Sequence, residues 1–376
     1  MRLLYIFRSL AVWGGIERIL VDKMNSFVKL NDMDVYLLTT DQGNHTIPFQ
    51  LNDRVRVKDL DICFCRRYQY GRFRRIWMLH KMKSRFENLL AIHIQEICPD
   101  VVICTTSDPI SSIAKVKGDI PLVVESHSIC SRTIGHGRNW LFRRINRYYF
   151  LKCLSKTEAL VALTTSDAME WQKFHTNVKV IPNMVHIEEG KISQQANKHA
   201  IFVGRFDYQK QVQSVIRIWS LVSKKYPEWV LDIFGDGEMA NEIEMMASQV
   251  PNVKLHKPVS NIFDYYRESS FLLSTSLFEP FGLVIPEAMS CGLPVVAFDC
   301  PFGPAEIISD GVDGFLVENG DISEFVQKVG CLIDNIVLRE EMGRRAIEAS
   351  KKYSSEFIIP IWKRFFEDVS SKCAYM

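Results

Sequence analysis

The chain has 376 residues, more than one hydrophobic core usually absorbs, so two domains are expected. Its composition, 47% hydrophobic and 24% charged, is that of an ordinary soluble globular protein. The net charge of +2 conceals a basic first half, with 27 Lys and Arg against 17 Asp and Glu over residues 1–185, and an acidic remainder with 19 against 27. Only the first half is therefore expected to face an anionic partner.

The N-terminal apolar run is cut by Arg8 after five residues, which is too short for a signal-peptide core. No apolar run reaches the roughly 18 residues of a membrane-spanning helix. The ten cysteines form no paired framework, and the Cys63–Cys65 pair has no second pair nearby. Reduced thiols in a cytoplasmic protein, which at most lies on a membrane surface, are expected.

In the first half, short aliphatic runs alternate with longer segments whose apolar residues recur every three or four positions. The predicted strands are Leu3–Phe7, Val35–Thr39, Val55–Leu60, Val101–Cys104, Leu122–Glu125, Leu160–Leu163 and Val178–Ile181. The predicted helices are Ile16–Leu30, Arg74–Ile97 and Trp140–Leu154. This alternation indicates a parallel sheet covered by helices on both faces, in a domain of residues 1–185.

Residues 186–198 are polar and without periodicity, which predicts a linker, and the alternation then restarts over residues 199–352. The predicted strands are Ile201–Val203, Val230–Phe234, Val253–His256, Phe271–Ser274, Val295–Phe298 and Phe315–Val317. The predicted helices are Gln211–Lys225, Glu238–Ser248, Ile262–Glu268, Leu283–Cys291, Ser323–Asn335 and Arg339–Lys352. We expect a second doubly wound α/β domain that faces the first across a cleft, with an aromatic-rich helix in residues 353–376 crossing back to the first domain.

Two stretches carry most of the basic excess of the first half. Ile62–Phe86 has eight Lys and Arg residues and Ser131–Thr157 has seven, and neither contains an acid. Both interleave bulky apolar residues, which is typical of helices that lie on an anionic membrane surface. The alternative is a solvated basic face whose aromatic residues point into the core.

The segment Ser276–Gly292 reads SLFEPFGLVIPEAMSCG, and it places Glu279 in a loop and Glu287 on the helix that follows. The N–H groups at such a helix start can hold a diphosphate, and a glycine there lets the backbone approach the ligand closely. These N–H groups belong to Phe281, Gly282 and Leu283. A carboxylate on the helix can accept hydrogen bonds from both hydroxyls of a ribose. The alternative is that Glu279 caps the helix and Glu287 is a surface charge.

A second motif, VGRFDYQKQ, follows the strand that ends at Val203. Gly204 turns the chain, and Arg205 and Lys210 precede a helix. Two cations at this spacing can hold a diphosphate that gains negative charge as it leaves, which is the task of Mg²⁺ in other enzymes. Taken alone, the pair could equally be two solvent-exposed charges that bind no ligand.

These motifs together resemble retaining glycosyltransferases of the GT-B fold, in particular the large family 4 and its bacterial capsule, O-antigen and lipid-linked glycan members. The run E-P-F-G-L-V-I-P-E resembles the family's E-x7-E signature, and Arg205 with Lys210 resembles its diphosphate-binding pair. The family usually has glycine after the lysine, where this chain has Gln211.

The resemblance extends to three weaker places. Gly14 and Gly15, in AVWGGIER, resemble the family's first glycine loop, and Gly235, in FGDGE, resembles its loop beside the nucleotide. By resemblance, His127 is the histidine that touches the transferred sugar. Each of the two glycine segments could also be an ordinary turn.

The resemblance implies two Rossmann-like domains and a metal-independent hexosyltransferase with no cofactor beyond the nucleotide-sugar co-substrate, a UDP-sugar being favoured. Implied catalytic residues are His127, Glu279, Arg205 and Lys210. Implied donor-binding residues are Gly14, Gly15, Gly204, Arg205, Lys210, Gly235, Glu279, Phe281, Gly282, Leu283 and Glu287. The two D-x-D triplets, Asp32–Asp34 and Asp59–Asp61, are expected to be turn residues rather than metal ligands.

The implied acceptor is a growing, lipid-linked surface glycan met at the inner face of the membrane, with no nucleic-acid partner. A nucleotide-sugar epimerase of the same fold and a non-catalytic nucleotide-sugar binding protein are the open alternatives. A dinucleotide oxidoreductase is disfavoured, because no G-x-G-x-x-G follows a strand.

Overall fold

The computed structural model describes residues 1–135, 140–187 and 192–374. The chain divides into two compact units: unit 1 is Met1–Pro182 with Ile358–Met376, and unit 2 is Asn183–Phe357. Residues 188–191 of the predicted linker and the last two residues of the chain lie outside the described part.

Unit 1 is built on a seven-stranded sheet in the order β3-β2-β1-β4-β5-β6-β7, and all its paired strands are parallel. Its strands are β1 (Arg2–Phe7), β2 (Asp34–Thr39), β3 (Arg56–Asp59), β4 (Val101–Thr105), β5 (Leu122–Glu125), β6 (Ala159–Ala162) and β7 (Val178–Val180). All seven strands predicted from the sequence are confirmed. The strand order reverses direction between β1 and β4, which is where a crevice opens at the carboxyl ends of parallel strands.

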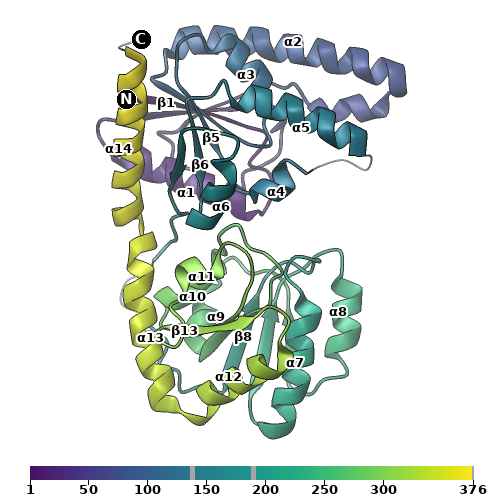
Figure 1. The fold of residues 1–376 in the computed structure, drawn as a ribbon, viewed down its shortest axis with the longest axis vertical. Coiled ribbons are helices and arrows are strands. Elements are labelled where there is room, and N and C mark those ends of the chain that lie inside the picture. The colour runs from purple at the N-terminus through teal and green to yellow at the C-terminus, as the bar shows by residue number, and fades with distance from the viewer. Residues whose placement is uncertain (136–139, 188–191, 375–376) are drawn as a thin grey trace. The chain divides into compact units, whose positions relative to one another are not determined.

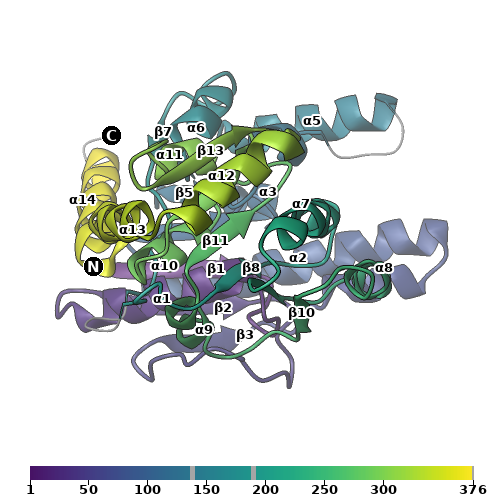
Figure 2. The same cartoon turned by 90° about the horizontal axis from the view of Figure 1, so that it is seen from below.

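Helices cover both faces of this sheet, and Figures 1 and 2 show their arrangement. They are α1 (Gly15–Lys29), a 3₁₀ turn η1 (Phe64–Gln69), α2 (Arg72–Ile97), α3 (Ile110–Val116), α4 (Cys130–Thr133), α5 (Trp140–Leu154) and α6 (Thr165–Trp171). Leu4 and Ile6 of β1 pack into one core with apolar residues of α2, α3 and α6. The intervening Leu3 and Tyr5 are equally buried, so the strand is apolar on both faces, as expected for a parallel sheet with two helical layers.

The last helix of the chain, α14 (Ser355–Ala374), contributes its residues from Ile358 onward to unit 1. Phe366 packs edge-on against Phe27 of α1 at a ring distance of 5.7 Å. The Lys23 ammonium lies 4.1 Å from the centre of the Trp362 ring, and Lys363 pairs with Asp32. Helix α14 is therefore held to α1 by ring contacts, a cation–π contact and an ion pair.

Unit 2 has a six-stranded parallel sheet in the order β10-β9-β8-β11-β12-β13. Its strands are β8 (His199–Val203), β9 (Val230–Phe234), β10 (Val253–His256), β11 (Phe271–Ser274), β12 (Val295–Asp299) and β13 (Gly314–Glu318). Its helices are α7 (Val212–Lys225), α8 (Ala240–Ala247), α9 (Phe263–Glu268), α10 (Val284–Ser290), α11 (Pro304–Ile307), α12 (Ile322–Asp334), α13 (Ile336–Ser350) and the 3₁₀ turn η2 (Lys351–Tyr353). All six predicted strands are again confirmed.

The elements absent from the sequence-based prediction are short. Helices α3, α4, α6 and α11 have four to seven residues, and η1 has six. One or two turns cannot show a helical repeat of apolar residues, so periodicity does not detect them. In the described part of the chain, no helix combines the length and the apolar character needed to span a bilayer.

We predict that Trp362→Ala lowers the free energy of unfolding by about 3–5 kcal/mol, because it empties a buried site and removes the partner of the buried Lys23 ammonium. Urea unfolding of the full chain measures this change. Ile361→Ala, an exposed position on the same helix, is the control and should stay within about 0.5 kcal/mol of the wild type. Equal effects of the two substitutions would contradict the packing described for α14.

Candidate active site

The predicted donor residues of unit 2 gather at the carboxyl edge of its sheet. Gly204 follows β8, Gly235 follows β9, and Glu279 lies in the loop after β11. Strands β8 and β11 are neighbours, and the strand order of unit 2 reverses between them. The two charged motifs found in the sequence therefore start at the topological switch point, where ligands of open α/β sheets bind.

The centre of this group is a buried ion pair. Lys210 Nζ lies 2.5 Å from Glu279 Oε1, and both side chains are largely buried, with 15% and 5% of their surface exposed. Ser276 Oγ donates a second hydrogen bond to the same oxygen at 2.6 Å. Because Glu279 is held by an ammonium and a hydroxyl, its carboxylate has a defined orientation before any ligand arrives.

The loops that carry this pair are joined by further hydrogen bonds. Leu277 N donates to the Gln209 carbonyl at 2.9 Å, and Thr275 Oγ1 donates to the carbonyls of Lys210 and Gln211. Sequence positions nearly 70 residues apart are thereby fixed side by side.

Arg205 lies in the same loop as Lys210 and is connected to it through Asp207. Its guanidinium pairs with Asp207 Oδ2 at 3.0 Å, and Asp207 Oδ1 accepts a bond from Lys210 N. The Arg205 side chain is 72% exposed, whereas Lys210 is largely buried. The two cations of the predicted pair thus lie in one loop, one largely buried and one largely exposed.

Gln211 explains how this chain departs from the family pattern. It has φ 49° and ψ 49°, the left-handed conformation that glycine adopts at least cost, and it directly precedes α7. Its side-chain amide donates to the Tyr208 carbonyl at 2.9 Å. The turn expected for glycine is retained, and the side-chain hydrogen bond offsets part of the strain.

Two glycines are required by close backbone packing around the pair. A Cβ at Gly235 would lie 2.0 Å from the Gly204 carbonyl oxygen, and one at Gly303 would lie 2.2 Å from the Phe281 carbonyl oxygen. The Gly303 N–H also donates to the Glu279 carbonyl at 2.9 Å. Gly235, predicted as a donor-binding residue, thus supports the Gly204 turn by its lack of a side chain.

The start of α10 presents backbone donors. Gly282 has φ 91°, a conformation that favours glycine, and the Phe281 side chain is buried against Tyr353. Among the described residues, no acceptor is found for the N–H groups of positions 281, 282 and 283. Glu287, one turn further along α10, is 2% exposed, and its carboxylate accepts a long hydrogen bond from Tyr266 at 3.5 Å.

His127 lies in unit 1, after β5, as part of a buried charged chain. Its Nε2 is 3.1 Å from Glu125 Oε2, and the same oxygen pairs with Lys23 of α1. Burial lowers the pKa of Lys23, and Glu125 offsets only part of that effect. Burial also acts to raise the pKa of Glu125, but the combined attraction of Lys23 and His127 outweighs it and the pKa is lowered. The charged state of Glu125 is thus maintained, and it orients the His127 ring.

Gly14 and Gly15 also lie in unit 1. Gly14 is the residue before α1, with extended φ and ψ, and a Cβ there would meet only the flexible end of the Glu17 side chain. Trp13 is 67% exposed and packs edge-on against Phe49. These glycines begin α1 next to the switch point of unit 1, and they are not required by positive φ.

The sequence reasoning missed Ser276, Lys23 and Glu125. Lys23 had a signal, because it falls between Leu20, Met24 and Phe27 on the apolar face of α1. A lysine at a core position predicts a buried anionic partner, although the partner's identity requires the fold.

Two family models match the chain: "Glycosyltransferase Family 4" over residues 13–189 and "Glycosyl transferases group 1" over residues 197–335. Together they match most of its length. The chain therefore belongs to the family 4 (group 1) glycosyltransferases, enzymes that use nucleotide sugars, and its two parallel α/β sheets form the GT-B fold.

Two distant relatives match the chain nearly end to end. The amylovoran biosynthesis glycosyltransferase AmsD of Erwinia amylovora is 25% identical, over 96% of this chain and 98% of that protein. A GalNAc-α-(1→4)-GalNAc-α-(1→3)-diNAcBac-PP-undecaprenol α-1,4-N-acetyl-D-galactosaminyltransferase of Campylobacter jejuni is 23% identical, over 95% and 96%. A mutant of TarM from S. aureus, solved with fondaparinux, α-GlcNAc-glycerol and UDP, has a TM-score of 0.77 at 18% identity, over 97% and 100%. The last comparison shows the shared fold.

We predict that Gln211→Gly changes the free energy of unfolding by no more than about 1 kcal/mol, because relief of left-handed strain offsets the lost side-chain hydrogen bond. Gln211→Val should lower it by about 2 kcal/mol or more, since a β-branched residue is disfavoured at this φ. Chemical denaturation of the two variants provides the comparison. A valine variant as stable as the glycine variant would show that the turn is not left-handed in solution.

Proposed function

We propose that this glycosyltransferase transfers a hexose or N-acetylhexosamine, with retention of anomeric configuration and without a metal ion, from a UDP-sugar to a growing, lipid-linked surface glycan. It would act in the cytoplasm, peripherally on the inner face of the membrane. The observation that carries the donor half of this proposal is the buried Lys210–Glu279 pair at the switch point of unit 2.

The pair suits a sugar diphosphate because it supplies both signs of charge in one place. Lys210, together with the exposed Arg205, would hold the phosphate oxygens, and the N–H groups of residues 281–283 would add neutral donors. Glu279 would accept bonds from hydroxyls of the transferred sugar, and Glu287 from the ribose. Gly204 and Gly235 would keep the backbone close to the ligand, and the family resemblance implies that Gly14, Gly15 and His127 of unit 1 also bind the donor.

The charge distribution suits the departure of the diphosphate, and attack from the same face is what the family resemblance implies. The bond between the anomeric carbon and the diphosphate oxygen breaks, and its electron pair leaves with the nucleoside diphosphate, whose growing charge Lys210 and Arg205 stabilise. The acceptor hydroxyl attacks from the face that the diphosphate leaves, and its proton passes to a phosphate oxygen of the leaving group. No co-reactant is needed for this balance, and the cations take the place of a metal ion.

The UDP and lipid parts of the proposal draw on relatives. UDP is bound in the TarM structure, and the Campylobacter enzyme is named for an undecaprenol-linked acceptor. An epimerase of the same fold would release a free sugar or epimer without an acceptor, and a binding protein would release nothing. Product analysis with and without a lipid-linked acceptor separates these alternatives.

We predict that Lys210→Ala and Glu279→Ala each lower kcat by about 10²–10³-fold, because each removes one preorganised charge beside the reacting groups. Initial rates of UDP release with a lipid-linked acceptor measure the loss, and circular dichroism checks that the variants remain folded. Lys224→Ala, an exposed position at the far end of α7, is the control and should keep full activity. Full activity in both site variants would exclude this mechanism.

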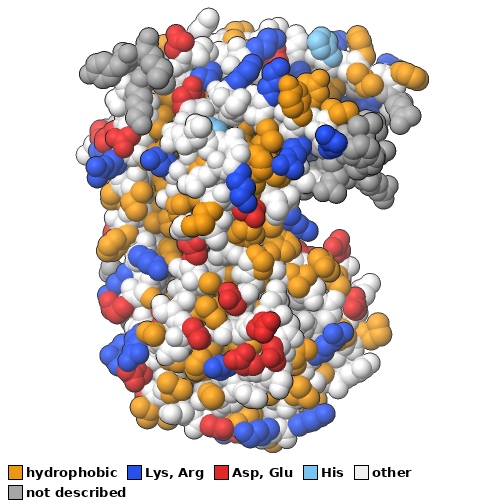
Figure 3. Space-filling model, viewed as in Figure 1, with side chains coloured by type: hydrophobic (Ala, Val, Ile, Leu, Met, Phe, Trp, Pro, Cys, Tyr) orange, Lys and Arg blue, Asp and Glu red, His pale blue; other side chains and the backbone are white. Residues whose placement is uncertain are grey.

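The membrane half of the proposal rests on an exposed surface, here called the basic–aromatic face: η1 and the first three turns of α2. Phe73, Ile76 and Trp77 are 87%, 67% and 58% exposed, so the alternative that these apolar residues point into the core is wrong. Arg75 lies over the Tyr68 ring at 4.2 Å and Lys81 over the Trp77 ring at 5.5 Å. Figure 3 shows Lys and Arg mixed with hydrophobic side chains over the part of unit 1 where Figure 1 places α2.

The second basic stretch supports the same interpretation in its described part. Tyr148 and Tyr149 of α5 are each 62% exposed, whereas Phe150 packs toward Trp171. Positions 136–139 lie outside the described residues, and Arg138 is among them. Exposed rings beside cations are the pattern of an interfacial helix on anionic lipid.

We predict that the protein floats with vesicles containing anionic phosphatidylglycerol at low salt and is released at 0.5 M NaCl, where the Debye length falls to roughly 4 Å. A double variant, Phe73→Ser with Trp77→Ser, should lose flotation because the apolar contribution is removed. Tyr208→Ser, which removes an equally exposed ring from unit 2, is the matched control. Binding that ignores lipid charge, or survives in the double variant, would contradict this role of the basic–aromatic face.

A further inference from the structure

The carboxyl edge of unit 1 holds a second candidate site, a cavity of about 340 Å³ that we call the β1–β4 pocket. Its wall is formed by Arg8 directly after β1, by Asp41 after β2, by Asp108 after β4, and by residues of η1 and α2. Strands β1 and β4 are neighbours at the point where the strand order of unit 1 reverses. The pocket thus occupies the ligand position of this sheet, as the Lys210–Glu279 pair does in unit 2.

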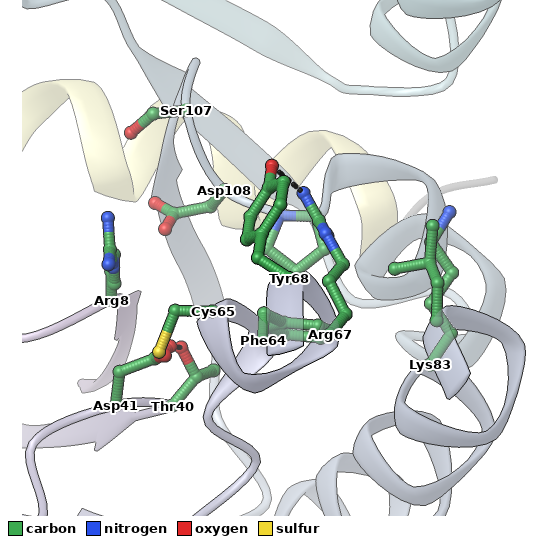
Figure 4. Close-up of a pocket in the computed structure, with 12 residues that line it drawn as sticks. Arg8, Thr40, Asp41, Phe64, Cys65, Arg67, Tyr68, Lys83, Ser107 and Asp108 are labelled. Atoms are coloured by element: carbon green, nitrogen blue, oxygen red, sulfur yellow. Dashed lines mark hydrogen bonds between the residues drawn. The ribbon is translucent and has the colours of Figure 1, made fainter. Parts of the chain in front are cut away.

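Three cations line the pocket: Arg8, Arg67 and Lys83. Among the described residues, none of the three forms an ion pair with a carboxylate. Arg67 instead donates to the Tyr68 hydroxyl at 2.8 Å and lies over its ring. Figure 4 shows Arg8 and Lys83 on opposite sides of the pocket, with Tyr68 and Arg67 between them. Cations that line one cavity without a carboxylate partner are suited to an anionic ligand.

Two carboxylates line the same pocket. Asp108 Oδ2 accepts hydrogen bonds from Thr105 N and Oγ1, and surrounding protein atoms raise the pKa of this carboxyl to about 7. Asp41 Oδ2 accepts a bond from Thr40, whereas its buried Oδ1 has no hydrogen-bond partner among the described residues. The charged form of one carboxyl group is thus disfavoured, and a buried oxygen of the other lacks a hydrogen-bond donor. Both features are typical of a site whose ligand supplies the donors.

This mixture of charges narrows the ligand class. A simple phosphate would meet two carboxylates that repel it, and a neutral sugar would leave three cations unused. A sugar phosphate satisfies both sets, because its hydroxyls donate to carboxylates and its phosphate accepts from cations. The cavity volume lies within the range of small-molecule sites.

We propose that the β1–β4 pocket binds the phosphate-bearing sugar of the acceptor, with Asp41, Asp108 and Arg8 on its hydroxyls and Arg67 and Lys83 on its phosphate. This inference rests on the proposed transferase function and names a position for its acceptor. The same phosphate could belong to a lipid diphosphate or to a water-soluble phosphate ester. The pocket adjoins the basic–aromatic face through Tyr68, and a neighbouring cavity shares Arg67 and Leu79 with it and extends to Arg75 and Ile76. This continuity favours the lipid-linked source.

The test uses the full chain saturated with UDP, so that the donor site is filled, and titrates it with N-acetylglucosamine 1-phosphate by calorimetry. The wild type should bind this probe at least tenfold more tightly than it binds N-acetylglucosamine or inorganic phosphate alone. Lys83→Ala should weaken binding of the probe by about tenfold or more, since a charge-assisted hydrogen bond is lost. Lys81→Ala, two residues away on α2 and outside the pocket lining, should change it less than twofold.

A second variant separates binding from folding. Asp108→Asn should weaken binding of the probe by about tenfold. It should also raise Tm at pH 8 by about 2 °C or more, because it removes a carboxylate whose charged form is disfavoured by burial. A residue with a purely structural role would not combine lost binding with gained stability. Unchanged probe affinity in Asp108→Asn would overturn the proposal.

The outcomes distinguish the pocket from the proposed function. The pocket assignment fails if Lys81→Ala and Lys83→Ala weaken binding of the probe equally. The transferase function still stands in that case, provided that UDP binds and sugar is transferred. If Lys210→Ala and Glu279→Ala keep full activity, the proposed function fails whatever the probe does. In transfer assays, the wild type should have a lower KM for a lipid-linked sugar diphosphate than for a water-soluble sugar phosphate, and Lys83→Ala should raise KM for both. An unchanged KM for both acceptors would also overturn the pocket assignment.

Discussion

The contact on which the carboxyl edge of unit 2 depends is the ion pair between Lys210 and Glu279. Two charges with so little exposed surface cost several kcal/mol of lost hydration unless other groups compensate them. Here Ser276 donates to the carboxylate, and the two loops are further joined by backbone and hydroxyl bonds. A glutamate and a lysine are thereby held in one orientation at the place where the order of the parallel strands reverses, as the proposed binding of a sugar diphosphate requires.

Unit 1 also contains a buried ion pair, formed by different residues. Lys23, on the first helix after β1, pairs with Glu125 at the end of β5, and Glu125 contacts His127. The other side of the Lys23 ammonium is covered by the Trp362 ring, which comes from the last helix of the chain. The C-terminal helix is thus connected to His127 through three successive contacts, and its packing sets the surroundings of a residue more than 200 positions away in sequence.

The secondary structure could be predicted well because each strand is a short continuous apolar run and each long helix shows its repeat. All thirteen strands lie within a residue or two of the predicted positions. Helices such as α6 (Thr165–Trp171) were not predicted, because seven residues make too few turns for an apolar repeat to be visible. The left-handed turn before α7 could only be suspected from sequence, since Gln211 stands where relatives of this family usually have glycine.

By itself, the sequence determined the fold class, the family and the charged motifs that follow β8 and β11, because these follow from local patterns and from motifs with fixed spacing. Tertiary structure decided which charges meet. The bond from Ser276 to Glu279, the burial of Lys23 against Trp362, and the convergence of Arg8, Lys83 and Asp108 on one cavity join separate segments of the chain. It also decided that Phe73, Ile76 and Trp77 of the first basic stretch face outward. Periodicity reports only that one side of a helix is apolar, whereas contacts between distant segments arise when parallel strands bring their carboxyl ends to a common edge.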